Sequence, residues 1–292
     1  MPFLPLDTQF PTHSGLPAHV WYSIHSCALI SESLSILGSI YIFYKSFKCW
    51  KNDKLTPMRA LPLMIGIGDF LYASLHGADH VYALALNHGP SGEICKVFAL
   101  FLWIPWNICL WASCTTAWYT YRTITTKKSP QVGRFYWKMV VPVVFGAAIP
   151  PLMGTLTGVT TPNGFYCDLQ GWFLIYQIIA NNVGLSFLIF FYVKSFLCLR
   201  EHVNELLALS YKRQQNPFEL SIVKMENVMH KLGSYLLIQI FLLAWADLYT
   251  ILSFSIADIT QWWFITVGIL LFVNLGGFLN AIAYRDRFKD DE

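Results

Sequence analysis

The basic residues of this chain lie almost entirely at alternate gaps between seven apolar stretches. The stretches cover roughly residues 21–44, 60–84, 94–121, 139–157, 171–197, 232–256 and 262–284. Each is close to or longer than the roughly 20 residues with which an α-helix crosses about 30 Å of hydrocarbon. All of the 20 Lys and Arg residues except Lys96 lie at the gap after the first, third or fifth stretch or after the seventh. Because cytoplasmic loops carry the excess of Lys and Arg, the pattern predicts seven transmembrane helices with the N-terminus outside and the C-terminus inside.

The composition is that of a membrane protein. Hydrophobic residues make up 55% of the chain and charged residues only 13%, and the mean hydropathy is +0.46. These values are unusual for a soluble domain and ordinary for a membrane bundle. We expect an all-α membrane protein, a seven-transmembrane helix bundle, with an extracellular tail over 1–20, one membrane domain over 21–284 and a short cytoplasmic tail over 285–292. The net charge of +3 belongs to loops that face anionic lipid, and nucleic acid is not expected as a partner.

The predicted topology sorts the seven cysteines by compartment. Cys95 begins the third stretch on the outer side, and Cys167 lies in the outer loop between the fourth and fifth stretches. These two alone occupy oxidising positions at segment ends, so we expect a disulfide between them.

Seven spans, an outer N-terminus and a bridge from the third span to the second outer loop form the plan of a G-protein-coupled receptor. The seventh span ends in residues 276–284, which read GGFLNAIAY. This run resembles the GFLNA-x-x-Y ending of the cyclic-AMP-receptor-like (class E-type) family of slime moulds, fungi and other simple eukaryotes, which is distantly related to the secretin and adhesion receptors. A Gly68-Asp69 pair in the second span and the cysteine pair support the same resemblance.

Other positions depart from the large rhodopsin-like class of receptors. Leu37-Gly38-Ser39 stands where many receptors carry Gly-Asn, no acidic residue directly precedes Arg122, and Asn280 is followed by alanine and not by proline. The resemblance implies a receptor of the plasma membrane that binds an extracellular small molecule or peptide and activates a heterotrimeric G protein. It implies no catalytic residue, no metal and no cofactor.

Ionisable and amide side chains in the middle of the spans are candidates for a conformational switch. An ionisable group at this depth costs at least about 2.5 kcal/mol to insert, so it normally faces inward and has a partner. A buried polar cluster can hold two alternative hydrogen-bond arrangements; the alternative is that it only joins the helices, at about 0.6 kcal/mol per contact. The candidates are Glu32, Asp69, Asn274, Asn280 and Tyr284.

The third span ends in Tyr119-Thr120-Tyr121-Arg122 at the cytoplasmic mouth. We expect Tyr119 and Arg122 to serve G-protein coupling, with Arg122 tied to the fifth to seventh spans at rest. The alternative is that Arg122 only anchors the helix end to the inner membrane surface.

Aromatic and polar residues in the outer halves of the spans are candidates for a small-molecule site, because such sites are crevices lined by aromatic rings with a few polar groups. The candidates are His76, Asp79, His80, Trp103, Asn107, Asn181, Trp245 and Asp247.

Three other classes of seven-span protein are alternatives to a receptor. His76, Asp79 and His80 share one helical face, as the ligands of an intramembrane zinc hydrolase would, and His25 is the available third imidazole. Such enzymes draw histidine from a late helix, whereas the third to seventh spans carry none inside the membrane. A small-solute transporter is disfavoured because no internal repeat is visible. A retinal protein is disfavoured because the seventh span has no Lys for a Schiff base.

Overall fold

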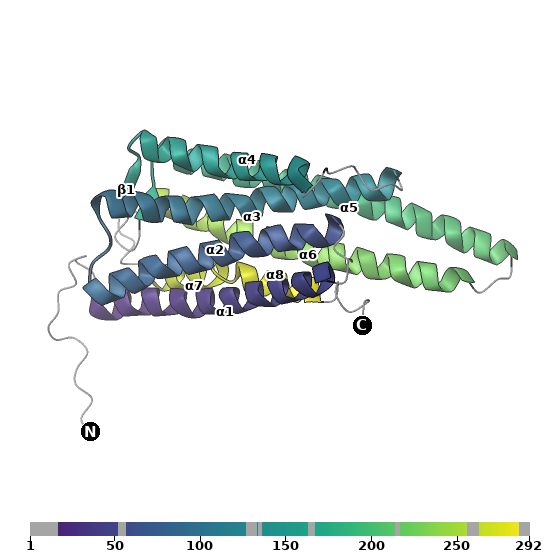
Figure 1. Ribbon diagram of the computed structural model, residues 1–292, viewed down its shortest axis with the longest axis horizontal. Coiled ribbons are helices and arrows are strands. Elements are labelled where there is room, and N and C mark those ends of the chain that lie inside the picture. The colour runs from purple at the N-terminus through teal and green to yellow at the C-terminus, as the bar shows by residue number, and fades with distance from the viewer. Residues whose placement is uncertain are drawn as a thin grey trace, which may run out of the picture.

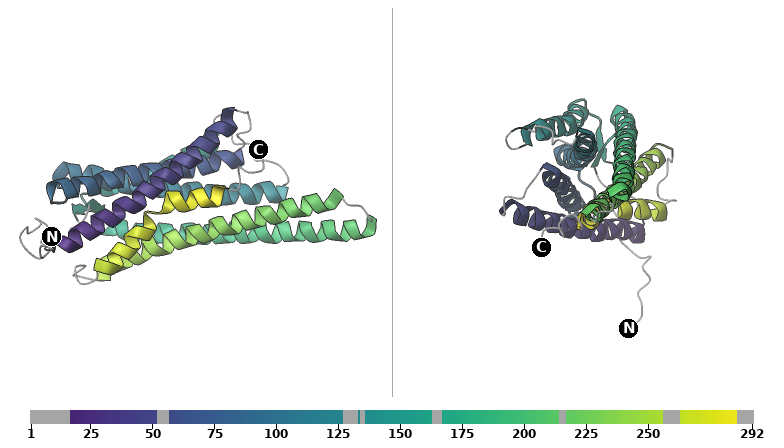
Figure 2. Two further views of the ribbon diagram at one scale, coloured as in Figure 1. Left: turned by 90° about the horizontal axis from the view of Figure 1, so that it is seen from below. Right: turned by 90° about the vertical axis from the view of Figure 1, so that its right-hand side faces the viewer.

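The structure, a computed structural model, describes residues 17–51, 57–126, 133, 136–162, 167–213, 217–255 and 263–285. Most of the predicted tails, 1–20 and 285–292, lies outside these residues. The described part is a bundle of long helices that run along one axis (Figures 1 and 2). The helices are α1 (Ala18–Lys51), α2 (Pro57–Leu86), α3 (Gly92–Thr126), α4 (Trp137–Leu156), α5 (Trp172–Arg213), α6 (Pro217–Ser255), α7 (Trp263–Val273) and α8 (Gly276–Arg285).

Seven spans result because α7 and α8 follow one another along the bundle as one broken span, Trp263–Arg285. Within the described residues, six spans are long and apolar enough to cross a membrane, and α2 is not among the six. Two acids and two histidines dilute the apolar character of α2, which nevertheless packs inside the bundle like the others (Figure 1). The predicted all-α, seven-transmembrane bundle is confirmed.

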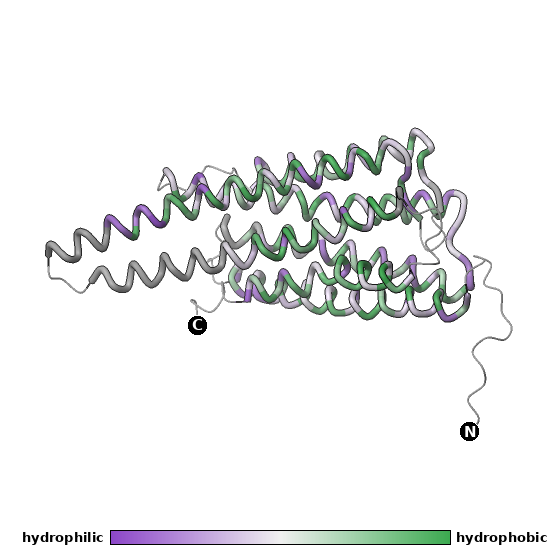
Figure 3. The backbone as a smooth tube through the Cα atoms, turned by 180° about the vertical axis from the view of Figure 1, so that it is seen from behind, coloured by the Kyte–Doolittle hydropathy of each residue, from purple (hydrophilic) through white to green (hydrophobic). Residues whose placement is uncertain are grey.

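Hydrophobic residues recur along the helices of the bundle (Figure 3), and their side chains lie on the outside as well as within. Leu37, Phe145 and Val183 are 59–63% exposed, whereas Glu32 and His80 are at most 1% exposed. A soluble protein of this size rarely exposes such a continuous apolar surface, and lipid is the solvent that matches it.

The break in the seventh span lies at Asn274 and Leu275, and Figure 2 shows the change of direction between α7 and α8 (yellow). The chain turns with a backbone bond from Leu275 to the carbonyl of Phe272, at 3.2 Å. The hydroxyl of Ser35 in α1 donates to the backbone carbonyl of Asn274. A helix can break at membrane depth only where such a neighbour satisfies the backbone group that the break releases.

The glycines of the GGFLNA run let α8 pack directly on the backbone of α1. A methyl group added at Gly277 would lie 2.7 Å from Oγ of Ser39 and 3.1 Å from the carbonyl carbon of Ser35. One added at Gly38 would lie 2.7 Å from Cα of Phe278. Small residues at a crossing allow this close approach, which is the main source of helix association in lipid.

Gly277→Leu is therefore expected to destabilise the bundle by about 1–3 kcal/mol or more, because α1 and α8 would have to separate. Gly268→Leu, in the same span, is the matched control, because no atom lies within 4 Å of a methyl group added there. Thermal unfolding of both purified variants in one detergent tests this. Equal melting temperatures would show that the α1–α8 crossing does not depend on Gly277.

Candidate functional site

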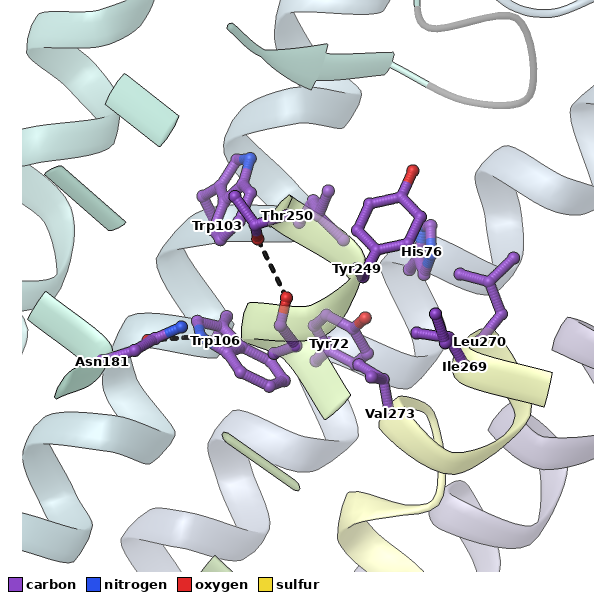
Figure 4. A pocket seen from close by; sticks show the side chains of 12 residues that line it. Tyr72, His76, Trp103, Trp106, Asn181, Tyr249, Thr250, Ile269, Leu270 and Val273 are labelled. Atoms are coloured by element: carbon purple, nitrogen blue, oxygen red, sulfur yellow. Dashed lines mark hydrogen bonds between the residues drawn. The ribbon is translucent and has the colours of Figure 1, made fainter. Parts of the chain in front are cut away.

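A pocket opens in the outer half of the bundle between five helices (Figure 4). It holds about 490 Å³ of space between atoms, part of it open to the surroundings, which is within the range of small-molecule sites. Aromatic and aliphatic side chains dominate its wall, and His76, Asn181 and Thr250 add polar groups. The lining residues are Tyr72, His76, Leu102, Trp103, Trp106, Asn181, Ala246, Tyr249, Thr250, Ile269, Leu270 and Val273.

Only part of the predicted ligand set lines this pocket. His76, Trp103 and Asn181 do so. Among the described residues, the others contact neighbours elsewhere. Trp245 stacks on Phe272 of α7, with ring centroids 5.0 Å apart. The remaining four are Asp79, His80, Asn107 and Asp247, whose partners are given below.

A β-hairpin closes the outer end of the bundle beside the pocket. It consists of β1 (Thr160–Pro162) and β2 (Cys167–Leu169), which pair antiparallel between α4 and α5. The expected disulfide between Cys95 and Cys167 is present and ties β2 to α3. The backbone N–H of Cys167 donates to Asp79 Oδ2 of α2 at 3.3 Å, so Asp79 serves the hairpin and not the pocket.

Asp168 connects the hairpin to the wall of the pocket. Its Oδ1 accepts hydrogen bonds from Trp103 Nε1 and from the backbone N–H of Leu169, each at 2.7 Å. Burial raises the pKa of Asp168 to about 6, although the bonds from Trp103 and Leu169 act to lower it. The hairpin therefore determines where the Trp103 ring stands in the pocket.

Amide side chains below the hairpin join α3, α5 and α6. Gln177 Nε2 donates to Asn107 Oδ1 at 3.3 Å and to Asn181 Oδ1 at 2.9 Å. Asn181 and Asn182 each donate to one carboxylate oxygen of Asp247, at 2.9 Å. Asp247 thus holds the outer half of α6 against α5.

A second polar network crosses the middle of the bundle. Asn280 of α8 donates to Asp69 Oδ2 of α2 at 2.8 Å and accepts from Gln239 of α6 at 3.2 Å. Gln239 in turn accepts from Ser113 of α3 at 3.3 Å, and Tyr235 of α6 donates to that Ser113 hydroxyl. One continuous chain of bonds therefore joins four helices, and we call these five side chains the central network.

Of the five predicted switch residues, two belong to this network and one lies beside it, whereas Asn274 and Glu32 have other partners. Asp69 and Asn280 are its members, and the ring of Tyr284 lies 5.6 Å from that of Tyr235. Asn274 accepts from the hydroxyl of Tyr72 at 3.0 Å. Glu32 lies nearer the outer end, among the histidines of α2, because its rotation on α1 turns it toward them.

Arg122 and Tyr119 lie at different depths of the inner end of α3. Arg122 is exposed, and the side chains of 206–232 in α5 and α6 lie outside the described ones, so its expected resting tie to these helices stays a prediction. Tyr119 is fully buried and packs on Met139 of α4 and Met64 of α2. Among the described side chains, Ser113 ties α3 to α6.

Gln239, Ser113, Tyr235 and Tyr72 are site residues that the sequence did not single out. A glutamine in the centre of an apolar span was the available signal, since an unpaired amide is costly in lipid. Ser113 gives no comparable signal, because a serine hydroxyl in a helix can also bond its own backbone. The tyrosines give none, because their rings pack equally well as apolar groups.

The stability of the outer end should depend on pH through Asp168. Its raised pKa means that the folded protein retains the proton while the unfolded chain loses it, so stability is full below about pH 4 and falls as pH rises through about 6. A shift of about two units corresponds to about 3 kcal/mol. Asp168→Asn should remove this component, measured as the difference in melting temperature from wild type between pH 4 and 7. A constant difference across that range would contradict the assignment.

The chain matches no protein-family model, and no curated protein sequence matches it. Among solved structures it is similar to the crystal structure of squid rhodopsin, with a TM-score of 0.73 and 16% sequence identity over 99% of this chain and 88% of that one. A likeness at this identity shows the fold: the chain has the seven-helix bundle of squid rhodopsin.

Proposed function

We propose that this protein is a seven-transmembrane receptor of the plasma membrane that binds an extracellular ligand and activates a heterotrimeric G protein by conformational switching. The observation that carries the proposal is the central network, which lies directly beneath the outer pocket and joins α2, α3, α6 and α8. The rhodopsin-like fold supports the same function. The finer assignment to the cyclic-AMP-receptor-like family rests on the GGFLNA-x-x-Y run of the seventh span.

The pocket and the network adjoin one another. A second cavity lies below the pocket and shares Tyr72, Trp106 and Val273 with its wall. The same cavity is lined by Asp69, Gln239, Asn274 and Asn280. A ligand that moves Tyr72 or Trp106 therefore changes the space in which the network is packed.

The wall of the pocket selects the class of ligand. No Lys or Arg is among the described residues that line it, and Lys96 at the outer end is exposed and paired with Glu93 at 2.6 Å. Aromatic rings and one amide favour a neutral or cationic small molecule. A nucleotide-like anion has no basic partner there.

The inner end offers the surface for the G protein. α5 and α6 extend beyond the inner ends of the other helices (Figure 1). Arg122 is exposed beside them at the end of α3. On this proposal the network holds α6 inward at rest, ligand binding weakens it, and α6 moves away to admit the G protein. Such a transition needs a ligand that favours one state by a few kcal/mol.

Reconstituted protein should raise guanine-nucleotide exchange on at least one member of a panel of heterotrimeric G proteins, and Arg122→Ala should abolish it by removing the exposed guanidinium. Lys48→Ala, an exposed basic residue at the inner end of α1, is the matched control and should retain exchange. If neither wild type nor a variant with raised basal activity promotes exchange on any partner, the receptor proposal is wrong.

Gln239→Leu supplies such a variant, because it removes the bonds of Gln239 to Ser113 and Asn280. At about 0.6 kcal/mol for each bond, the ratio of active to resting protein should rise roughly sevenfold. Leu237→Ala is the control, because the side chain of Leu237 in α6 is 68% exposed. Asp69→Asn should likewise change the rate of guanine-nucleotide exchange while leaving the melting temperature nearly unchanged. Exchange equal to that of the control in both network variants would remove the network from the switch.

A further inference from the structure

Four side chains of α1 and α2 form a buried cluster in the outer half of the bundle. The cluster consists of His25 and Glu32 from α1 and His76 and His80 from α2, each no more than 3% exposed. Because His76 and His80 are four residues apart, they lie one helical turn apart on the face of α2 that meets α1. Among the described residues, Glu32, His76 and His80 bring one ligand atom each to within 4.8 Å of one another.

The distances from Glu32 to the two histidines of α2 are too long for hydrogen bonds and suit an ion between the groups. Nε2 of His76 lies 4.0 Å and Nε2 of His80 lies 3.9 Å from Glu32 Oε1. A direct hydrogen bond would need about 3.2 Å or less. Two ligands of a tetrahedral zinc ion, each about 2.1 Å from the metal, stand about 3.4 Å apart. The two distances to Glu32 exceed this by about half an ångström, and since all three atoms lie within 4.8 Å of one another, no pair has to close by more than about 1.4 Å to share one ion.

Glu32 carries the strongest reason to expect a cation. Both of its carboxylate oxygens are buried, and neither has a hydrogen-bond partner in the part of the chain that the structure describes. An ionised carboxylate in an apolar interior is very costly unless a cation or donors compensate it. No Lys or Arg occurs within the outer half of α1 or α2 to do so.

Two further features prepare the cluster for a metal. A methyl group added at Gly77 would lie 2.9 Å from Glu32 Oε2, so the glycine leaves the space that the carboxylate occupies. Nδ1 of His80 lies 2.6 Å from Nδ1 of His25. With the proton on Nδ1 of His80, His25 accepts the bond and Nε2 of His80 carries the lone pair that can bind metal, the arrangement by which a second shell orients a ligating imidazole.

We propose that Glu32, His76 and His80 bind a Zn²⁺ ion that ties α1 to α2 at the wall of the outer pocket. The two imidazoles and one carboxylate match the ligands of zinc, whereas Ca²⁺ and Mg²⁺ prefer sets made of oxygen. His76 also lines the pocket, so an ion can enter from it (Figure 4). The zinc-hydrolase alternative considered from the sequence used His76, Asp79 and His80. The proposed set differs in one ligand, because Asp79 accepts from the hairpin and Glu32 takes its place.

Metal analysis of the full-length protein in detergent tests the proposal without reference to signalling. Protein stripped with EDTA and dialysed against ZnCl₂ should take up about one zinc per chain, and Glu32→Gln and His80→Ala should each lose it. His88→Gln is the control, because that histidine lies outside the cluster and bonds Gly89. Zinc at about 100 times its dissociation constant should raise the melting temperature of wild type by roughly 5 °C. The melting temperature of Glu32→Gln should stay nearly unchanged.

X-ray absorption on zinc-loaded wild type keeps the test valid if a variant fails to fold. Nitrogen and oxygen at about 2.0–2.1 Å with imidazole scattering is the expected result. Sulfur in the first shell, or zinc content that is the same in Glu32→Gln and wild type, overturns the proposal. So does an infrared band of a protonated carboxylic acid that persists at saturating zinc and is absent from Glu32→Gln, since Glu32 would then hold a proton in place of the ion.

Discussion

In a bundle surrounded by hydrocarbon, a polar side chain is stable only where another helix supplies its partner. This constraint acts on the rotation of those helices that carry buried polar side chains, such as α2, α3, α6 and α8. Asp69 and Asn280 are at most 7% exposed and contact each other, while the outward faces carry isoleucine, phenylalanine and leucine. The same constraint explains the broken seventh span, because Ser35 satisfies the carbonyl that the break at Asn274 releases. Polar pairs thus decide which faces meet, and apolar packing fills the space around them.

The polar side chains form two layers at different depths, and Tyr72 is the connection between them. Its ring lies 5.5 Å from that of His76 in the outer layer and 5.8 Å from that of Trp106 in the pocket wall. Its hydroxyl donates to Asn274, at the break between α7 and α8. Tyr72 is thus in contact with the pocket wall, the histidine cluster and the break, and for the proposed switch it is the side chain through which a displacement in one would reach the other two.

The architecture was predictable because it depends on sums over many residues. Seven apolar stretches and the distribution of Lys and Arg give the spans and their order, and the order leaves Cys95 and Cys167 together on the outer side. Contacts between individual polar groups were not predictable in the same way. Asp69 and His76 are seven residues apart, which is two turns or about 10 Å along α2, and depth alone could not say which of them Glu32 would meet.

Tyr119 shows a second limit of the sequence. The third span is apolar on every side, so hydrophobic periodicity does not reveal which face turns inward. The aromatic run before Arg122 suggested a role of Tyr119 in G-protein coupling but not which way its ring points, and the ring packs between α2 and α4. Arg122 could be placed at the helix end from the charge pattern alone. Whether it had a partner depended on the neighbouring helices.

The outer end and the middle of the bundle differ in the kind of contact that joins their helices. At the outer end a disulfide and the hydrogen bonds of Asp79 and Asp168 attach the hairpin to α2 and α3. In the middle, α6 is held to its neighbours by Gln239 and Tyr235 through hydrogen bonds, each worth about 0.6 kcal/mol in a membrane bundle. Hydrogen bonds of this strength exchange more readily than a disulfide-linked hairpin rearranges. For the proposed receptor, the contacts of α6 in the middle layer are therefore the ones that a ligand with a modest difference in affinity between two states would shift.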